Sequence, residues 1–220
     1  MYRLTSALSH IKKYNKDFFK LLELSTKYIS LYKSDILNSF ASITYHKTCF
    51  INVISERATE VFFIEDLAHQ CGHIIFNILT IDADKFLNYP KETMLGELID
   101  KPLDIEPRVL YGAFHGLFTY SCILECLDEY ISNNSYSTQT LKLEALARIG
   151  FFTRKMSADL EAFYGKNIFT ELGDEAYKKF IENYLYMYDK YINDFKLYLY
   201  ANQPYIFDFD IFVDENHIKI

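Results

Sequence analysis

The chain has 220 residues, of which 50% are hydrophobic and 24% are charged, and its formal net charge is −7 at pH 7. This length and hydrophobic share are enough for one substantial core, so we expect a single domain over residues 1–220. The negative charge, with no stripe of lysine and arginine, argues against a nucleic-acid partner. The longest uncharged stretch, residues 109–124, is shorter than the roughly 20 residues that span a bilayer, so no membrane partner is expected.

The cysteine usage and the start of the chain bear on its compartment. Cys49, Cys71, Cys122 and Cys126 form no CxxC pair, and the first residues lack the charged start and apolar core of a secretion signal. We therefore expect free thiols and a cytoplasmic location. The spacing of Cys122 and Cys126 is more typical of two small core residues than of two metal ligands.

The first 54 residues predict helices followed by a short sheet. Residues 5–40 are rich in Leu, Phe and Tyr and favour one or two helices, whereas residues 42–54 alternate and carry β-branched side chains. One or two short strands should place Phe50, Asn52 and Ile54 on one face. The fold class that we expect is mainly α, a single helical domain with a small hairpin or short sheet beside its helices.

A long helix is predicted next, over residues 58–81, and it carries two histidines on one face. His69 and His73 are four residues apart, which is a rotation of roughly 400° and about one turn along the axis. This spacing is that of the HExxH zinc motif, in which the second residue is a glutamate base. Here that residue is Gln70, which cannot accept a proton from a metal-bound water. The alternative reading is a hydrogen-bonded pair of core histidines.

A second candidate helix, over residues 107–131, contains a third histidine. Pro107 is typical of a first helical turn, with Asp104 or Ile105 near the cap. Gly112 and Gly116 flank His115 and would let another helix or a ligand approach closely. The alternative is a helix crossing that happens to contain a histidine. Between the two helices, residues 85–107 predict a long loop, either a lid over a site or a passive connection.

The rest of the chain predicts two more helices and a strand. A break at residues 132–135 precedes helices near 138–164 and 174–200, the second of which should expose several tyrosines. Residues 205–213 alternate and predict a strand that pairs with the earlier strands or with a partner chain, as in a homodimer.

Two segments together resemble a known family. The run from His69 to His73 reads HQCGH, and about 35 residues later residues 106–116 read EPRVLYGAFHG. This pattern resembles the HExxH-motif domain of the 2-oxoglutarate-dependent peptide β-hydroxylases, which are encoded with ribosomally made peptide natural products. The resemblance covers about residues 40–130, the motif core, and is specific in the spacing of arginine, glycine and histidine. Gln70 and Val109 depart from the family pattern, which usually has glutamate and often proline there.

The resemblance implies an iron(II) site. His69, His73 and His115 match the metal-binding histidines, Arg108 matches an arginine for the cosubstrate 2-oxoglutarate, and Gln70 is left with a supporting position beside the ligands. Three neutral ligands would leave open positions on the metal for a keto acid and dioxygen. If His115 were not the third ligand, Glu125, Asp66 and Glu97 are the alternatives.

Arg108 also suits the cosubstrate by its spacing from His115. In a continuous helix, seven residues are nearly two turns, so the two side chains would share a face about 10 Å apart, close to the span of a five-carbon diacid. A guanidinium binds a carboxylate through two hydrogen bonds. The alternative is a surface arginine at a helix start.

The function that we expect is therefore a dioxygenase that hydroxylates the β-carbon of a residue in a peptide or small-protein substrate, with Fe(II) as cofactor and 2-oxoglutarate as cosubstrate. Two other readings stay open. One is a zinc peptidase, which Gln70 makes hard to defend. The other is an inactive homologue that binds a peptide in its helical groove.

Overall fold

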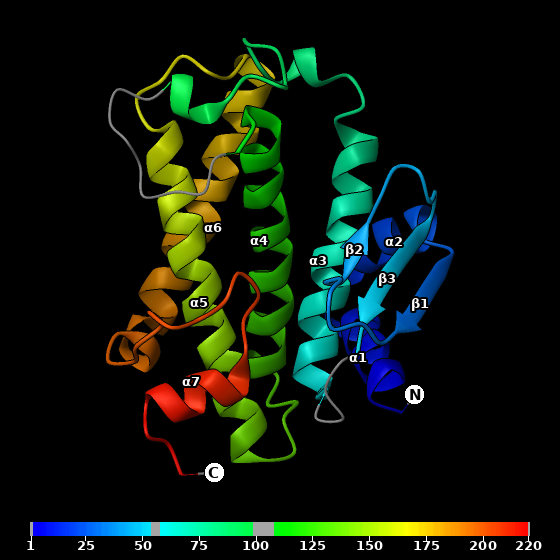
Figure 1. Cartoon of the computed structure of the whole chain (residues 1–220), viewed down its shortest axis with the longest axis vertical. Coiled ribbons are helices and arrows are strands. Elements are labelled where there is room, and N and C mark those ends of the chain that lie inside the picture. Colours follow the sequence, from blue (N-terminus) through cyan, green and yellow to red (C-terminus); the bar gives the residue numbers. More distant parts are fainter. Residues whose placement is uncertain (1, 54–57, 99–107, 220) are drawn as a thin grey trace.

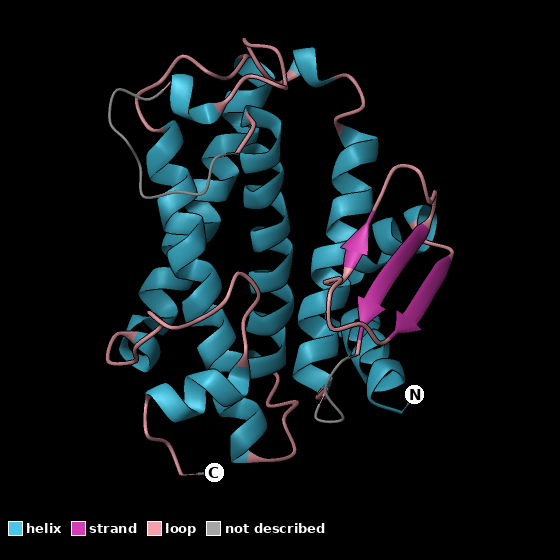
Figure 2. Cartoon of the chain, in the orientation of Figure 1, coloured by secondary structure: helices cyan, strands magenta, loops and turns pink. Residues whose placement is uncertain are grey.

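The computed structural model describes residues 2–53, 58–98 and 108–219, and these residues are mostly helical (Figure 2). The described part contains seven α-helices, two short 3₁₀ turns and one sheet of three strands. This confirms the mainly α class with a small sheet. The elements are α1 (Tyr2–Tyr14), α2 (Lys16–Ser25), β1 (Tyr28–Tyr32), β2 (Phe40–Ala41), β3 (Thr48–Asn52), α3 (Glu60–Leu79), η1 (Ala83–Lys85), η2 (Leu95–Glu97), α4 (Leu110–Ser132), α5 (Gln139–Phe163), α6 (Glu171–Phe195) and α7 (Phe209–Glu215).

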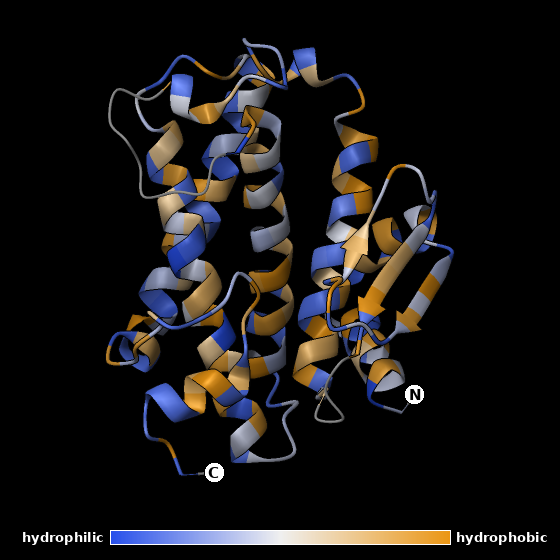
Figure 3. Cartoon of the chain, viewed as in Figure 1, coloured by the Kyte–Doolittle hydropathy of each residue, from blue (hydrophilic) through white to orange (hydrophobic). Residues whose placement is uncertain are grey.

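Helices α3, α4, α5 and α6 run alternately up and down, and α4 packs against the other three (Figure 1). Much of α4 and the strands β2 and β3 are hydrophobic, as their orange shades in Figure 3 show. The α4 side chains Phe114, Leu117, Ile123, Leu124 and Tyr130 are almost completely buried. Burial on more than one side explains why α4 is apolar around most of its circumference.

The sheet lies beside α3, on the side away from α5 and α6, together with α1 and α2 (Figure 1). Its order is β1-β3-β2, with β1 parallel and β2 antiparallel to β3. Cys49 and Ile51 are fully buried from β3, whereas Phe50 is half-buried on the other face. Ile54, which we expected on the face of Phe50, lies outside the described residues.

Residues 28–32 correct the helix prediction for residues 5–40. They form β1, because backbone pairing with β3 from Tyr28 opposite Thr48 to Tyr32 opposite Asn52 outweighs the weak local preference. The Asn52 amide further fixes the connection that follows β1, since it donates to the carbonyls of Ser34 and Leu37 at 2.7 and 2.6 Å.

The motif helix was predicted closely. Thr59 caps α3 by accepting a hydrogen bond from the Phe62 amide at 3.0 Å. α4 begins at Leu110, with Val109 as its N-cap residue, and this is later than the predicted start at residue 107. Asp104, Ile105 and Pro107 lie outside the described residues.

The strand prediction for residues 205–213 was wrong. Asp208 accepts a hydrogen bond from the Ile211 amide at 3.0 Å and starts the short helix α7. Phe212 is then fully buried, with its ring 5.2 Å from that of Tyr198. The aromatic residues of this segment therefore also suit a helix. Phe209 and Phe212 are three residues apart and lie on the same helix face, with their ring centres 6.2 Å apart. Residues 205–213 contain no strand that could pair with a partner chain, so this segment gives no support to a homodimer.

Candidate functional site

The three predicted histidines come together between α3 and α4. The ring centres of His69 and His73 are 4.8 Å apart, and those of His73 and His115 are 4.3 Å apart. All three side chains are partly exposed, although the residues around them on both helices are buried. The third histidine is therefore a neighbour of the motif pair, and a small molecule can reach the rings.

A glycine allows this close approach. A Cβ atom on Gly72 would lie 3.4 Å from the Thr119 side chain and 3.7 Å from its Cα atom, so α3 and α4 are nearly in backbone contact there. Gly72 is next to His73, and Thr119 is one turn after His115. The HQCGH sequence thus contains both the histidine pair and the residue that lets the third ring approach it.

His73 and His115 are in direct contact through their nitrogens. His73 Nδ1 and His115 Nε2 lie 2.7 Å apart and share a hydrogen bond, so one nitrogen carries the proton. On its other side the His115 ring stacks on Phe76, with centres 4.6 Å apart and planes inclined by 14°. This stacking fixes the plane of the His115 ring and directs its nitrogen toward His73.

The imidazoles are uncharged near neutral pH. Burial lowers the pKa of His73 to about 4, and burial followed by the neighbouring His73 lowers that of His115 to about 2. The pKa of His69 is also lowered, first by burial and then by His73. Neutral imidazole is the form that binds metal ions.

The three imidazoles are suitable ligands for a metal ion, but their nitrogens do not point at a common centre. Two nitrogens bound at about 2.1 Å and at right angles on one ion would be roughly 3 Å apart, close to the 2.7 Å between His73 and His115. His69 contacts the pair through His73. Among the described residues, however, no three His, Cys, Asp or Glu side chains are arranged as a metal site. A bound ion would therefore require the rings to turn toward a common point.

Gln70 is held on another side of α3. Its amide donates a hydrogen bond of 3.0 Å to Asp66, which also accepts one of 2.5 Å from the Ser39 hydroxyl. Burial raises the pKa of Asp66 to about 6, against the effect of both hydrogen bonds. A glutamate in place of Gln70 would put two buried carboxylates side by side, which is costly. The amide at this position thus suits its carboxylate neighbour, and within the described residues its carbonyl oxygen, Oε1, accepts no hydrogen bond from the three rings.

Arg108 lies near the histidines, but it is not in the same helix as His115, although the sequence predicts that it is. It precedes the α4 N-cap, so the helical spacing that we used for Arg108 and His115 does not apply. Its guanidinium folds back onto Gly116, where a Cβ atom would lie 3.4 Å from Nη1. There it donates a hydrogen bond to the buried carboxylate of Asp159 on α5 and lies beside the Tyr120 hydroxyl.

The other residues singled out from the sequence take separate places. Gly116 provides room for the Arg108–Asp159 pair, whereas a Cβ atom on Gly112 would meet only the Val109 side chain. Of the alternative third ligands, Glu125 is exposed and accepts a hydrogen bond from Asn183, and Glu97 is exposed in η2. Asp66 is engaged with Ser39 and Gln70.

The described parts of the loop over residues 85–107 pack against the start of α4. The amides of Leu95 and Leu110 donate to the carbonyls of Arg108 and Thr93, at 2.9 and 2.7 Å. Residues 99–107 lie outside the described part of the chain, so the lid stays a prediction.

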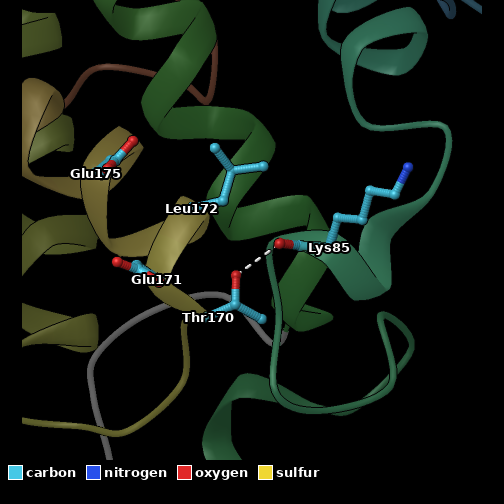
Figure 4. A pocket seen from close by; sticks show the side chains of 5 residues that line it. All are labelled: Lys85, Thr170, Glu171, Leu172 and Glu175. Carbon is cyan, nitrogen blue, oxygen red and sulfur yellow. Dashed lines mark hydrogen bonds between the residues drawn. The ribbon is translucent and has the colours of Figure 1, made fainter.

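A pocket of about 410 Å³ opens elsewhere, at the N-terminus of α6 (Figure 4). There the Thr170 hydroxyl donates a hydrogen bond of 2.6 Å to the Lys85 carbonyl. The residues that line it are Lys85, Thr170, Glu171, Leu172 and Glu175. None of the three histidines lines it, so we do not assign this pocket to the candidate site.

Helix α5 contributes residues to the site that no sequence motif indicated. Phe152, Lys155 and Asp159 follow one another at helical spacing toward α3 and α4, and the Phe152 ring is 6.5 Å from that of His69. Their spacing was visible in the sequence. Only the packing of α5 against α3 and α4 brings this face to the histidines.

Comparison with protein-family models found no match, and comparison with curated protein sequences found none either. The four cysteines are buried and unpaired, as expected. In the described part of the chain, no helix is both long and apolar enough to cross a bilayer.

Proposed function

We propose that this protein is an iron(II)- and 2-oxoglutarate-dependent oxygenase that hydroxylates the β-carbon of a residue in a ribosomally made peptide. The observation that carries the proposal is the meeting of His69, His73 and His115, from two helices, as neutral and partly exposed imidazoles. The resemblance of residues 69–73 and 106–116 to the HExxH-type hydroxylases supplies the reaction class.

Each residue has a role in this proposal. The three imidazoles hold the metal, and Arg108 provides a cation for the cosubstrate. Iron(II) with 2-oxoglutarate and dioxygen supplies the oxidation of a C–H bond. The protein keeps the imidazoles neutral by burial and orients His115 by stacking on Phe76. Gln70 has no part as a base, since an amide does not accept a proton near neutral pH.

The unpaired thiols fit a reducing compartment, and we expect the enzyme in the cytoplasm.

A zinc peptidase is a weaker candidate, because it needs a free carboxylate as its base. Among the described residues near the rings, the carboxylate is that of Asp159, and Arg108 already binds it. An inactive peptide-binding homologue is the third reading, and it requires no metal.

Anaerobic titration separates these three functions. Iron(II) and then 2-oxoglutarate are added to the purified protein, and the visible spectrum is recorded. An oxygenase of this class should show the weak charge-transfer band of a chelated keto acid, and admission of oxygen should consume both the band and the 2-oxoglutarate.

The matched control is His46→Ala, which removes an exposed histidine far in sequence from the motif and should leave the band unchanged. His73→Ala should abolish it. Binding of zinc with hydrolysis of peptides, and no band with iron, would favour the peptidase. If neither metal binds, the oxygenase proposal is wrong.

A further inference from the structure

A second cation stands beside Arg108 at the histidine site. Lys155 lies on α5 between Phe152, whose ring faces His69, and Asp159, which binds Arg108. Its ammonium nitrogen is 5.8 Å from the centre of the Tyr120 ring, and Tyr120 in turn packs against Gly116, next to His115. Lys155 therefore reaches the space between α4 and α5 at the level of the rings.

The C-terminal segment holds the ammonium in place. Lys155 Nζ donates a hydrogen bond of 2.9 Å to the Tyr205 carbonyl and lies 3.9 Å from the centre of the Tyr205 ring. The segment before α7 is thus attached to the candidate site through this lysine.

The charges here favour an anion. Arg108 and Lys155 contribute two positive charges and Asp159 one negative charge, so these three side chains together carry one positive charge. The Arg108 charge is already balanced by Asp159, whose second oxygen, Oδ2, has no hydrogen-bond partner among the described residues. An incoming carboxylate near Arg108 alone would therefore meet the Asp159 carboxylate as well.

We propose that Lys155 binds the distal carboxylate of the dicarboxylic cosubstrate at the histidine site, with Arg108 held by Asp159 as the second cation. This inference rests on the proposed function, and it identifies a binding residue that the sequence motifs do not contain. An ammonium on a flexible four-carbon stem can turn toward a ligand while the guanidinium stays paired.

The test compares two ligands that differ in one carboxylate. Dissociation constants of 2-oxoglutarate and of 2-oxopentanoate, which lacks the distal carboxylate, are measured for the anaerobic iron(II) protein. Lys155→Met should weaken 2-oxoglutarate roughly tenfold or more and leave 2-oxopentanoate within about twofold, because only the first ligand loses a charged hydrogen bond. Lys155→Arg should restore part of the affinity.

The matched control is Arg154→Met, which removes the neighbouring positive charge on α5 while Arg154 is exposed and faces the Tyr200 ring. It should change neither affinity. Equal weakening of both ligands by Lys155→Met, or no weakening of either, would overturn the role of Lys155.

Failure of the proposed function gives a different result, because the unaltered protein would then bind no iron(II) in metal analysis. In that case succinate is titrated into the metal-free protein by calorimetry. Binding that Lys155→Met weakens and Arg154→Met does not would still support an anion site at Lys155. Absence of succinate binding would overturn it.

Discussion

His73 Nδ1 and His115 Nε2 lie 2.7 Å apart and share a hydrogen bond that joins α3 to α4. The two histidines are 42 residues apart in the chain. In two neutral imidazoles, one ring nitrogen donates this hydrogen bond and the other accepts it, so the contact needs no metal. The same nitrogens would be only a few tenths of an ångström further apart as neighbouring ligands of one ion, since that separation is roughly 3 Å. The contact is thus compatible with both a metal-free and a metal-bound form.

Removing His115 should lower metal binding. For His115→Ala we expect iron(II) content, measured by metal analysis after anaerobic loading and desalting, to decrease at least tenfold, because loss of one imidazole ligand weakens a three-ligand site severely. His46→Ala is the control and should load as the unaltered protein does. Full loading of His115→Ala would place the third ligand elsewhere.

Removing the Arg108 guanidinium should affect the cosubstrate and spare the metal. Arg108→Met should weaken 2-oxoglutarate binding roughly tenfold, with iron content near that of the unaltered protein. Lys91→Met, an exposed lysine that precedes it in the connecting segment, is the control. Unchanged 2-oxoglutarate affinity in Arg108→Met would limit this residue to its pairing with Asp159.

The close approach at Gly72 should tolerate a methyl group and reject a larger one. Its Cβ atom would be in ordinary contact with Thr119, so Gly72→Ala should change the free energy of unfolding by less than about 1 kcal/mol. Gly72→Leu should destabilise the protein by about 2 kcal/mol or more, since it forces α3 from α4. Urea denaturation measures both, with Gly96→Ala, which meets no atom within 4 Å, as the control. Equal effects of Ala and Leu would contradict the packing.

A buried ion network predicts how stability depends on pH. Arg148 binds Glu144 at 2.7 Å and also donates to Glu65, all three side chains being almost fully buried. Burial raises the pKa of Glu65 to about 7, although Arg148 opposes this. The folded protein therefore retains a proton that the unfolded chain releases near pH 4.5. The resulting stabilisation is complete below pH 4.5 and is lost as the pH rises through 7.

We expect the free energy of unfolding of Glu65→Gln, measured by denaturation from pH 5 to pH 8, to decrease less with pH than that of the unaltered protein. The exposed Glu182→Gln is the control and should keep the original dependence. A parallel decrease in Glu65→Gln would show that Glu65 does not carry the proton.

The contact between α4 and α6 should depend on Asp128. This buried carboxylate accepts hydrogen bonds from Tyr191 at 2.5 Å and from Lys190 at 2.6 Å. Asp128→Ala leaves the buried Tyr191 hydroxyl without this acceptor, whereas Lys190 keeps Ser132 and Tyr186, and it should destabilise the protein by about 1–3 kcal/mol. Glu182→Ala, which breaks an exposed pair with Lys179, should cost less than about 0.5 kcal/mol. Similar costs in urea denaturation would contradict the importance of burial.

Local sequence was enough for the long helices and for the histidine pair. Periodicity and the cap at Thr59 located α3, and the spacing of His69 and His73 put both rings on one face. The same reasoning failed for β1 and α7, because short segments take their conformation from their partners. β1 forms against β3, and α7 forms where Phe212 can be buried.

The sequence by itself determined which side chains were candidates for the site, namely the imidazoles of His69, His73 and His115 and the guanidinium of Arg108. Only the tertiary structure decided that His115 meets His73, that Asp159 binds Arg108 and that Lys155 lies beside them. The physical reason is that these contacts join α3, α4 and α5 across long stretches of chain. Periodicity gives the direction of a side chain around its own helix, but the packing of the helices against each other determines what that side chain contacts.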